Sequence, residues 1–276
     1  MKELLFDALL DTCKSIPVLF LCYLLIEYME HRNNDQVKDI IRQNHKRSIF
    51  FGSLVGLIPQ CGFSVAAANL FARGFLSLGT LIAIFITTSD EAPLLFISES
   101  RYKELGMILL LKLFIALFAG YLVDSFYPSR KKEESERLVS YHEEHCEHGI
   151  VKEAIAHTAE IALYILLINI ALNILFASMS DALLNRVFLR DSLAQVFILA
   201  LIGMFPNCAA SIFITKLYFS NALSFASLLA GLISVAGLGY PTLIKYHKNR
   251  KEDLRIILCI YFTAVISGSI LYYLHF

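Results

Sequence analysis

Tryptophan is absent from this 276-residue chain, and neither sign of charge is in excess, because 24 lysines and arginines balance 24 aspartates and glutamates. Without a basic surplus there is no electrostatic footprint for nucleic acid, so we expect no nucleic-acid partner. Any aromatic belt at a membrane surface would have to come from the 13 tyrosines and 21 phenylalanines.

Common catalytic motifs are missing as well. The chain contains no HExxH, no G-x-S-x-G and no GxxxxGK(S/T), which mark zinc proteases, serine hydrolases and ATP-binding loops. We therefore expect no enzyme activity, including that of an intramembrane enzyme, and no ATP hydrolysis. We also expect no resident cofactor, so that any bound metal would be cargo and transport would be coupled to an ion gradient.

Paired cysteine spacing is also lacking. The six cysteines are Cys13, Cys22, Cys61, Cys146, Cys208 and Cys259. They form neither a disulfide framework nor a C-x-x-C zinc site, so we expect reduced thiols. The N-terminal stretch is interrupted by Asp7, Asp11 and Lys14 and has no small-residue cleavage site, so we expect no cleaved signal peptide.

Apolar residues dominate what is present. Hydrophobic residues make up 57% of the chain and the mean hydropathy is +0.62, which is typical of a membrane protein. Long apolar runs lie at about 15–30, 49–73, 76–98, 105–127, 158–178, 193–218, 222–244 and 254–274. Each run is close to the ~20 residues that cross a bilayer as a helix. We predict an all-α, multi-pass integral protein of the plasma (cytoplasmic, inner) membrane, with the lipid bilayer as a partner.

The two halves of the chain resemble each other. Residues 49–86 and 196–233 align without a gap at an offset of 147 and share 12 identities in 38 positions, against roughly four expected by chance. The stretch GLIPQCGFS (56–64) thereby matches GMFPNCAAS (203–211). We expect a first transmembrane repeat over 1–127, a charged cytoplasmic loop over 128–153 and a second repeat over 154–276.

A proline interrupts the same apolar run in each half. Pro59 and Pro206 cannot donate to a helix ladder, and each disfavours helical geometry in the preceding residue. One interpretation is a simple proline kink. The other is a helix broken into two half-helices, which survives at membrane depth only where it is buried in protein or lines a cavity.

The distribution of lysine and arginine bears on the topology. Lys112 stays inside the membrane in either topology. If each broken segment crosses the membrane, the other lysines and arginines divide 14 to 9 between the two sides; if each is a re-entrant hairpin, they divide 16 to 7. The cytoplasmic side then holds loops 31–48, 128–153 and 245–255, and the positive-inside rule favours the hairpin. An odd number of crossings per half would make the two repeats inverted.

An acid pair lies in the apolar segment FITTSDEAPL (85–94). Ionised Asp90 and Glu91 at membrane depth would be costly, so they are expected to be functional or paired. The alternative is neutralisation by Lys112 on the following span. The matching stretch SVAGLGYPT (234–242) has no carboxylate, but its glycines and Pro241 can break the helix and turn carbonyls towards a ligand.

The broken segments and the acid pair define a candidate cation site, because the acid pair favours a positively charged guest. Its residues are Gln60, Cys61, Ser64, Ser89, Asp90 and Glu91 in the first half, and Asn207, Cys208 and Ser211 in the second. Oxygen ligands suit manganese, whereas Cys61 and Cys208 would suit zinc, cadmium or trivalent arsenic. A cysteine in such a run can equally be a small apolar residue.

A second candidate metal site lies in the charged loop. The stretch YHEEHCEH (141–148) contains His142, His145, Cys146 and His148, and short tracts of this kind bind transition metals. The alternative is a solvated charged loop.

PQCGFS, PNCAAS, SDEAP and the histidine-bearing loop together resemble the ten-helix heavy-metal exporter family, relatives of the arsenic-efflux permeases that are often labelled manganese transporters. The resemblance covers nearly the whole chain. It implies ten helices, if each hairpin counts as two, and export of a metal or metalloid. Two hypotheses stay open: a secondary exporter of a divalent metal, or a permease for arsenite or organoarsenicals that uses Cys61 and Cys208. The ion, the direction and coupling ion of transport, and the oligomeric state, including a homo-oligomer, are also open.

Overall fold

A computed structural model of the chain describes residues 45–88, 91–127, 192–206, 208–247 and 249–274, with scattered residues between 13 and 24 and between 155 and 170. Within these ranges the chain is helical and forms no strand, which confirms the all-α fold class. Four helical stretches of the described part are long and apolar enough to cross a membrane; they are Leu78–Ser98, Tyr102–Phe126, Phe225–Tyr246 and Arg250–Tyr273.

The helices of the two halves correspond in order and bounds. The first half contains α3 (His45–Gly56), α4 (Cys61–Ala72), α5 (Leu78–Thr87), α6 (Ala92–Ser98) and α7 (Tyr102–Phe126). The second contains α11 (Leu193–Gly203), α12 (Cys208–Phe219), α13 (Phe225–Ser234), α14 (Gly239–Tyr246) and α15 (Arg250–Tyr273). Packing corresponds as well, because α5 packs between α3 and α7 as α13 packs between α11 and α15.

Both proline motifs break their helices outright. The first break lies between Gly56 and Cys61, and the second between Gly203 and Cys208. Neither motif is a simple kink, because several residues leave the helical ladder before a new helix begins. This is the expected consequence of a residue that lacks an N–H donor and restricts its predecessor.

A second break follows in each half. In the first half α5 ends at Thr87 and α6 begins at Ala92, and in the second residues 235–238 separate α13 from α14. Gly237 has a positive φ of 49°, a conformation that glycine adopts without steric cost. Pro93 and Pro241 fall in the first turn of the helix that follows each break, where a missing N–H is tolerated. The predicted break around Pro241 is confirmed.

The α3–α4 pair forms a hairpin, because α3 and α5 run in the same direction. A Cβ added to Gly52 would lie 3.1 Å from side-chain atoms of Thr80 and Ile84, and one added to Gly56, a turn later, would meet Thr87. Since α3 and α5 are parallel, α5 begins at the end of the bundle where α3 begins. The intervening α4 must therefore run back to that end.

The α11–α12 pair forms the equivalent hairpin. Gln195, at the start of α11, donates to the carbonyl of Ala222 at 2.9 Å and accepts from the N–H of Ser224 at 3.3 Å, just before α13. At the other end, Gly203 lies against Gly231 and Ser234. Because α11 and α13 are parallel, α12 is the returning arm.

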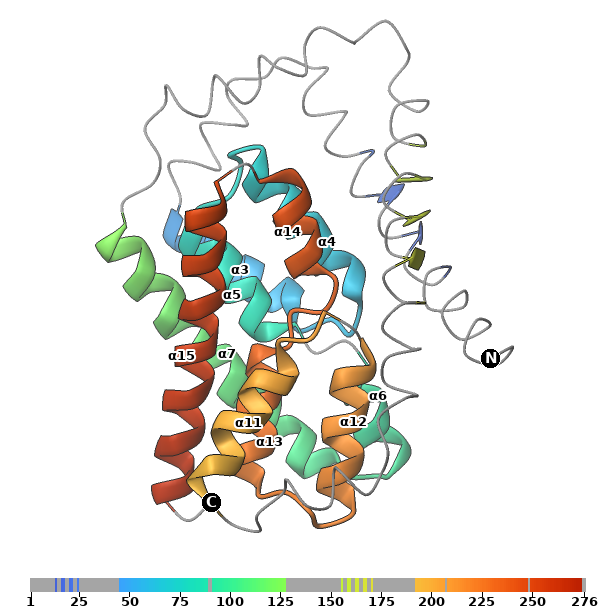
Figure 1. The fold of residues 1–276 in the computed structure, drawn as a ribbon, viewed down its shortest axis with the longest axis vertical. Helices are drawn as coiled ribbons and strands as arrows, with labels where there is room; N and C mark the ends of the chain where they lie inside the picture. Colours follow the sequence, from blue (N-terminus) through green and yellow to red (C-terminus); the bar gives the residue numbers. More distant parts are fainter. Residues whose placement is uncertain are drawn as a thin grey trace, which may run out of the picture.

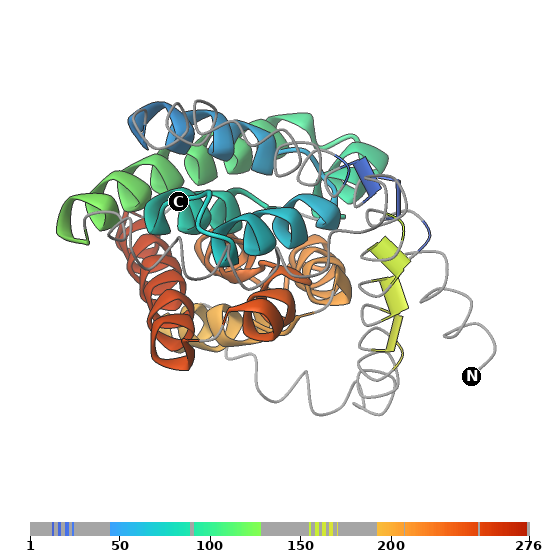
Figure 2. The same ribbon diagram turned by 90° about the horizontal axis from the view of Figure 1, so that it is seen from above.

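The returning arm of each hairpin packs against the other half of the chain. Figure 1 shows α4 beside α14 in the upper part of the molecule and α12 beside α6 in the lower part. Ring centroids are 5.3 Å apart for Phe71 and His247 at the ends of α4 and α14, and 5.0 Å for Phe96 and Phe219 at the ends of α6 and α12. Seen from above, the two halves lie on opposite sides (Figure 2).

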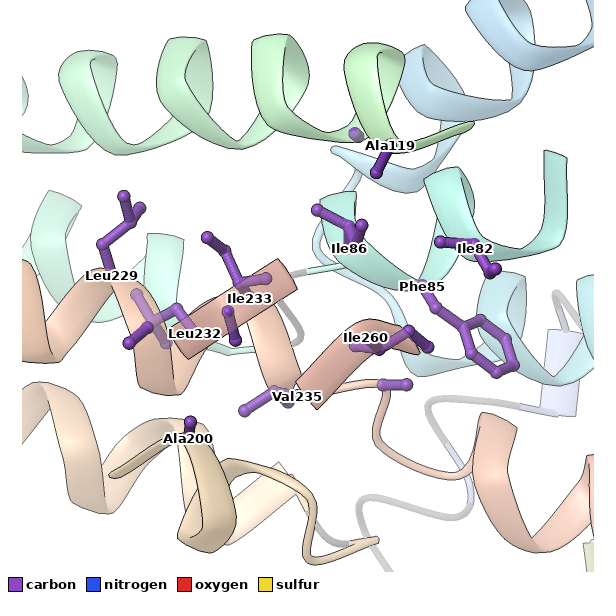
Figure 3. Close-up of a cluster of buried hydrophobic side chains, with 14 of the residues drawn as sticks. Ile82, Phe85, Ile86, Ala119, Ala200, Leu229, Leu232, Ile233, Val235 and Ile260 are labelled. Carbon is purple, nitrogen blue, oxygen red and sulfur yellow. The ribbon is translucent and has the colours of Figure 1, made fainter. Parts of the chain in front are cut away.

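The core is an apolar layer shared by the two halves. Ile86 of α5, Ile233 of α13 and Ile260 of α15 are fully buried and point into the same region (Figure 3). On its outer face α7 instead exposes Leu110 and Phe114, each at 70%. An exposed apolar face on a 25-residue helix suits contact with lipid rather than water.

Candidate functional site

The broken helices α5 and α13 end at the same place inside the bundle. Nζ of Lys112, from the middle of α7, donates to the carbonyl of Thr88 at 2.7 Å and to the carbonyl of Leu232 at 2.8 Å. Thr88 caps α5, and Leu232 lies in the last turn of α13. One ammonium group therefore joins the carboxyl ends of two helices from opposite halves, where helix dipoles favour positive charge.

The start of α14 closes one side of this centre. The rings of Phe85 and Tyr240 meet edge to face with centroids 5.6 Å apart, and the Tyr240 hydroxyl donates to the carbonyl of Ser234 at 2.9 Å. A Cβ added to Gly239 would lie 2.8 Å from the Phe85 ring and 3.1 Å from Cβ of Ser64. The first turns of α4 and α14 therefore approach each other beside the end of α5.

Both proline-led breaks connect to this centre through the same kind of contact. Gly56 packs against Thr87 near the end of α5, and Gly203 packs against Ser234 at the end of α13. The Thr87 hydroxyl donates to the carbonyls of its own helix at 3.0 Å, as the Ser234 hydroxyl does at 2.8 Å to Gly231. These hydroxyls hydrogen-bond to the last turns of α5 and α13. Because Gly56 and Gly203 have no side chain, each proline-led break can lie directly against them.

Of the predicted site residues, two serines are placed deep in the bundle. Ser64 and Ser211 are completely buried in the first turns of α4 and α12. Gln60 precedes α4 as its N-cap and is half-buried. Glu91 precedes α6 and is also half-buried. The structure thus puts these four residues at helix starts that follow breaks.

The remaining predicted residues are described partly or not at all. Cys61 and Cys208 are the first residues of α4 and α12, but their side chains lie outside the described part. Ser89, Asp90 and Asn207 fall outside it altogether, as do His142, His145, Cys146 and His148 of the charged loop. Among the side chains that are described, no three His, Cys, Asp or Glu residues gather where they could hold a metal ion.

The structure also reveals contacts that the sequence interpretation missed. The sequence suggests Lys112 only as a residue that neutralises the acid pair, but two of its partners are backbone carbonyls. The sequence does indicate that Lys112 is unusual, since it is the only charged residue of α7 between Glu104 and Asp124. A second missed contact is the buried pair of His247 and Asp253, which joins the end of α14 to the first turn of α15.

An all-helical membrane protein whose broken helices meet inside the bundle has the plan of a transporter. The comparison with protein families agrees: the family described as "Putative, 10TM heavy-metal exporter" matches residues 2–181, which is more than half of the chain. The chain therefore belongs to this heavy-metal exporter family. No curated protein and no solved structure matches the chain.

Proposed function

We propose that this protein is a secondary-active exporter of a divalent metal cation, with manganese as the first candidate and zinc-like ions next. The observation that carries the proposal is the meeting of the carboxyl ends of α5 and α13 at Lys112. Two helix ends of this kind create a negative potential inside the bundle. Asp90 and Glu91 follow α5 after Thr88 and Ser89 in the sequence, so acidic side chains and helix ends would favour the same positively charged guest.

The proposed site draws ligands from both halves. From the first it takes Gln60, Cys61, Ser64, Ser89, Asp90 and Glu91, and from the second Asn207, Cys208 and Ser211. Carboxylate, amide and hydroxyl oxygens are ligands that suit manganese, and thiolates suit zinc-like ions. The burial of Ser64 and Ser211 at equivalent positions supports a site that both halves share.

We also propose that the two halves are inverted repeats in the plasma (cytoplasmic) membrane, with 128–153 on the cytoplasmic side. One observation supports the orientation and a second supports the inversion. The hairpin arrangement matches the larger charge asymmetry, 16 to 7 in lysine and arginine. In addition, α4 pairs with α14 at one end of the bundle as α12 pairs with α6 at the other, which is what a two-fold axis in the membrane plane would produce.

A second candidate function is efflux of arsenite or organoarsenicals. The observation that favours it is the equivalent placement of Cys61 and Cys208, each of which opens the helix that follows a proline-led break. Thiolates are the preferred ligands of soft ions. In this case the cysteines would bind the metalloid, and the acid pair would handle protons.

The experiment is a metal profile of cells that express the protein in a metal-sensitive host, measured across the first transition row and arsenic. We expect lower manganese or zinc content and higher metal tolerance, and we expect Asp90→Asn to abolish both. Glu99→Gln is the matched control, because Glu99 is an exposed carboxylate at the end of α6. Unchanged export by Asp90→Asn would remove the carboxylate from the proposal.

A further inference from the structure

Lys112 is a cation buried where the proposed cargo would pass. It is 0% exposed and lies on the inner face of α7, where Ile108 and Ala116, one turn away on either side, are also buried. Burying an ammonium group is costly unless it is paired and hydrogen-bonded. Its retention at this depth therefore requires a local environment that favours positive charge.

That environment comes from both halves at once. The carbonyls of Thr88 and Leu232 accept from Nζ at 2.7 and 2.8 Å, and both belong to helix ends that carry partial negative charge. Carbonyl oxygens at helix ends are also the groups with which broken helices coordinate transported cations. The ammonium of Lys112 thus occupies a position that suits a mobile cation.

The fold itself does not require a lysine there. Gly120 of α7 packs against Ile49 and Ala83 as Gly268 of α15 packs against Val196 and Ala230, so α7 and α15 correspond at an offset of 148. By that offset the counterpart of Lys112 is Ile260, which is fully buried. An apolar residue therefore fills the equivalent position in the second half.

The lysine and the acid pair occur in the same half. By the offset of 147, Asp90 and Glu91 correspond to Gly237 and Leu238, so the second half lacks the carboxylates as well as the ammonium. The first half holds two acids that follow α5 in the sequence and one cation, Lys112, whose ammonium contacts the end of α5. The acids and the lysine are thus present together in the first half and absent together from the second. This indicates that Lys112 balances the charge of the site and is not needed for packing of the bundle.

We propose that Lys112 is a tethered cation that competes with the transported metal: its ammonium balances the empty site and lowers the affinity for a divalent guest, so that the guest can leave. This inference rests on the proposed function. At an effective dielectric constant of about 20, the repulsion between a fixed ammonium and a divalent ion in the same site is large enough to change affinity at least about tenfold. A neutral residue would therefore hold the metal more tightly and release it more slowly.

The test is a titration of the purified full-length protein with manganese and with zinc, followed by the metal-dependent rise in thermal stability and by direct binding. Lys112→Met removes the charge, and Lys112→Arg keeps it. Ile260→Met is the matched control, because it changes a side chain at the equivalent buried position without changing charge. Lys112→Gln is a second neutral variant, for use if Lys112→Met fails to fold, because its amide keeps two N–H donors for the buried carbonyls.

We expect the neutral variants to bind metal at least about tenfold more tightly than the wild type, with slower export, while Lys112→Arg and Ile260→Met keep the wild-type affinity. A neutral variant whose affinity is unchanged or weaker, in a wild type that binds metal, would overturn this inference alone. A wild type that binds neither metal would overturn the proposed function and the inference with it.

Discussion

Gly56 and Thr87 touch so closely that no side chain fits between them: a Cβ on Gly56 would overlap Oγ1 of Thr87 and lie 2.9 Å from the carbonyl oxygen of Ile84. The equivalent residues Gly203 and Ser234 touch in the same way. Each contact holds a proline-led break against the end of the parallel helix. The two glycines therefore set the distance between each hairpin and the centre of the bundle.

Substitution of these glycines should destabilise the fold to different degrees. A Cβ on Gly203 would overlap the backbone oxygen of Gly231, which cannot rotate away, whereas the first obstacle to Gly56 is the side chain of Thr87. Gly203→Ala should cost about 1–3 kcal/mol, as overpacking does, and Gly56→Ala should cost less. Thermal unfolding of the purified variants shows which substitution lowers the stability more. A Gly203→Ala variant as stable as the wild type would show that the contact is looser than the structure has it.

Gly106 is the matched control for this series. It lies in α7 with nothing within 4 Å of the position of an added Cβ. Gly106→Ala should therefore be neutral or stabilise the protein by about 0.5–1 kcal/mol, because alanine loses less backbone entropy in a helix than glycine.

The contact between Gly56 and Thr87 can be tested with a double variant. Combining Gly56→Ala with Thr87→Ala should restore part of the stability that Gly56→Ala alone loses, because the first obstacle to the added Cβ is then removed.

The sequence predicted the breaks because their causes are local. Pro59 and Pro206 act on the backbone through geometry that needs no neighbour, and the offset of 147 carried the same expectation to both halves. The sequence could not show in this way that the two arms of a hairpin pack against different helices, α3 on α5 and α4 on α14. Whether α4 packs on α3 or on α14 depends on which apolar faces fit in three dimensions, and α4 itself is too uniformly apolar to reveal its partner by periodicity.

The first turn of α5 depends on a carboxylate from the far end of α7. Asp124 accepts from the Ser77 hydroxyl and from the N–H of Gly79, both at 2.6 Å, and Ser77 in turn caps the N–H of Thr80. Hydrogen bonds to a charged group are worth about 1.5–3 kcal/mol. Asp124→Ala should lower the free energy of unfolding by an amount in this range.

A double-mutant cycle tests whether Ser77 and Asp124 act together. Since they share a hydrogen bond, Ser77→Ala should cost less in the Asp124→Ala background than in the wild type. Thermal unfolding of the four proteins gives the coupling. Strictly additive losses would mean that the two side chains support α5 independently.

The hairpins make a prediction about accessibility. Arg73 follows α4 and is half-buried, and its counterpart Ser220 follows α12 and is exposed. In a background without the native cysteines, Arg73→Cys should react with a membrane-impermeant thiol reagent from the cytoplasmic side, and Ser220→Cys from the outside. Reaction of both positions from the same side would rule out inverted repeats.

Replacing the cysteines separates the two candidate functions. Cys61→Ser combined with Cys208→Ser keeps two small polar residues at the starts of α4 and α12 but removes both thiols. If the cargo is manganese, export should largely survive, since manganese prefers oxygen ligands. If the cargo is an arsenical, efflux should disappear. Cys259→Ser is the control, because Cys259 is a free cysteine within α15 and does not open a helix after a proline-led break.

The candidate site was only partly predictable from the sequence. Membrane-embedded charge pointed to Asp90, Glu91 and Lys112, because ionisable residues in apolar segments are costly and rarely incidental. The partners of Lys112 could not be inferred, since Thr88 and Leu232 contribute backbone carbonyls, which every residue possesses. Their selection depends on where α5 and α13 end relative to α7, and this is a property of the assembled bundle.

The decisive measurement is manganese flux through the purified protein in liposomes, with a metal-sensitive dye enclosed and an ion gradient imposed across the membrane. We expect the wild type and Glu99→Gln to carry manganese, and Asp90→Asn and Glu91→Gln not to carry it, although all four proteins fold and reconstitute equally. Wild-type rates of manganese flux in Asp90→Asn and Glu91→Gln would contradict the proposed cation site, because the cation would then pass without the acid pair that follows α5 in the sequence.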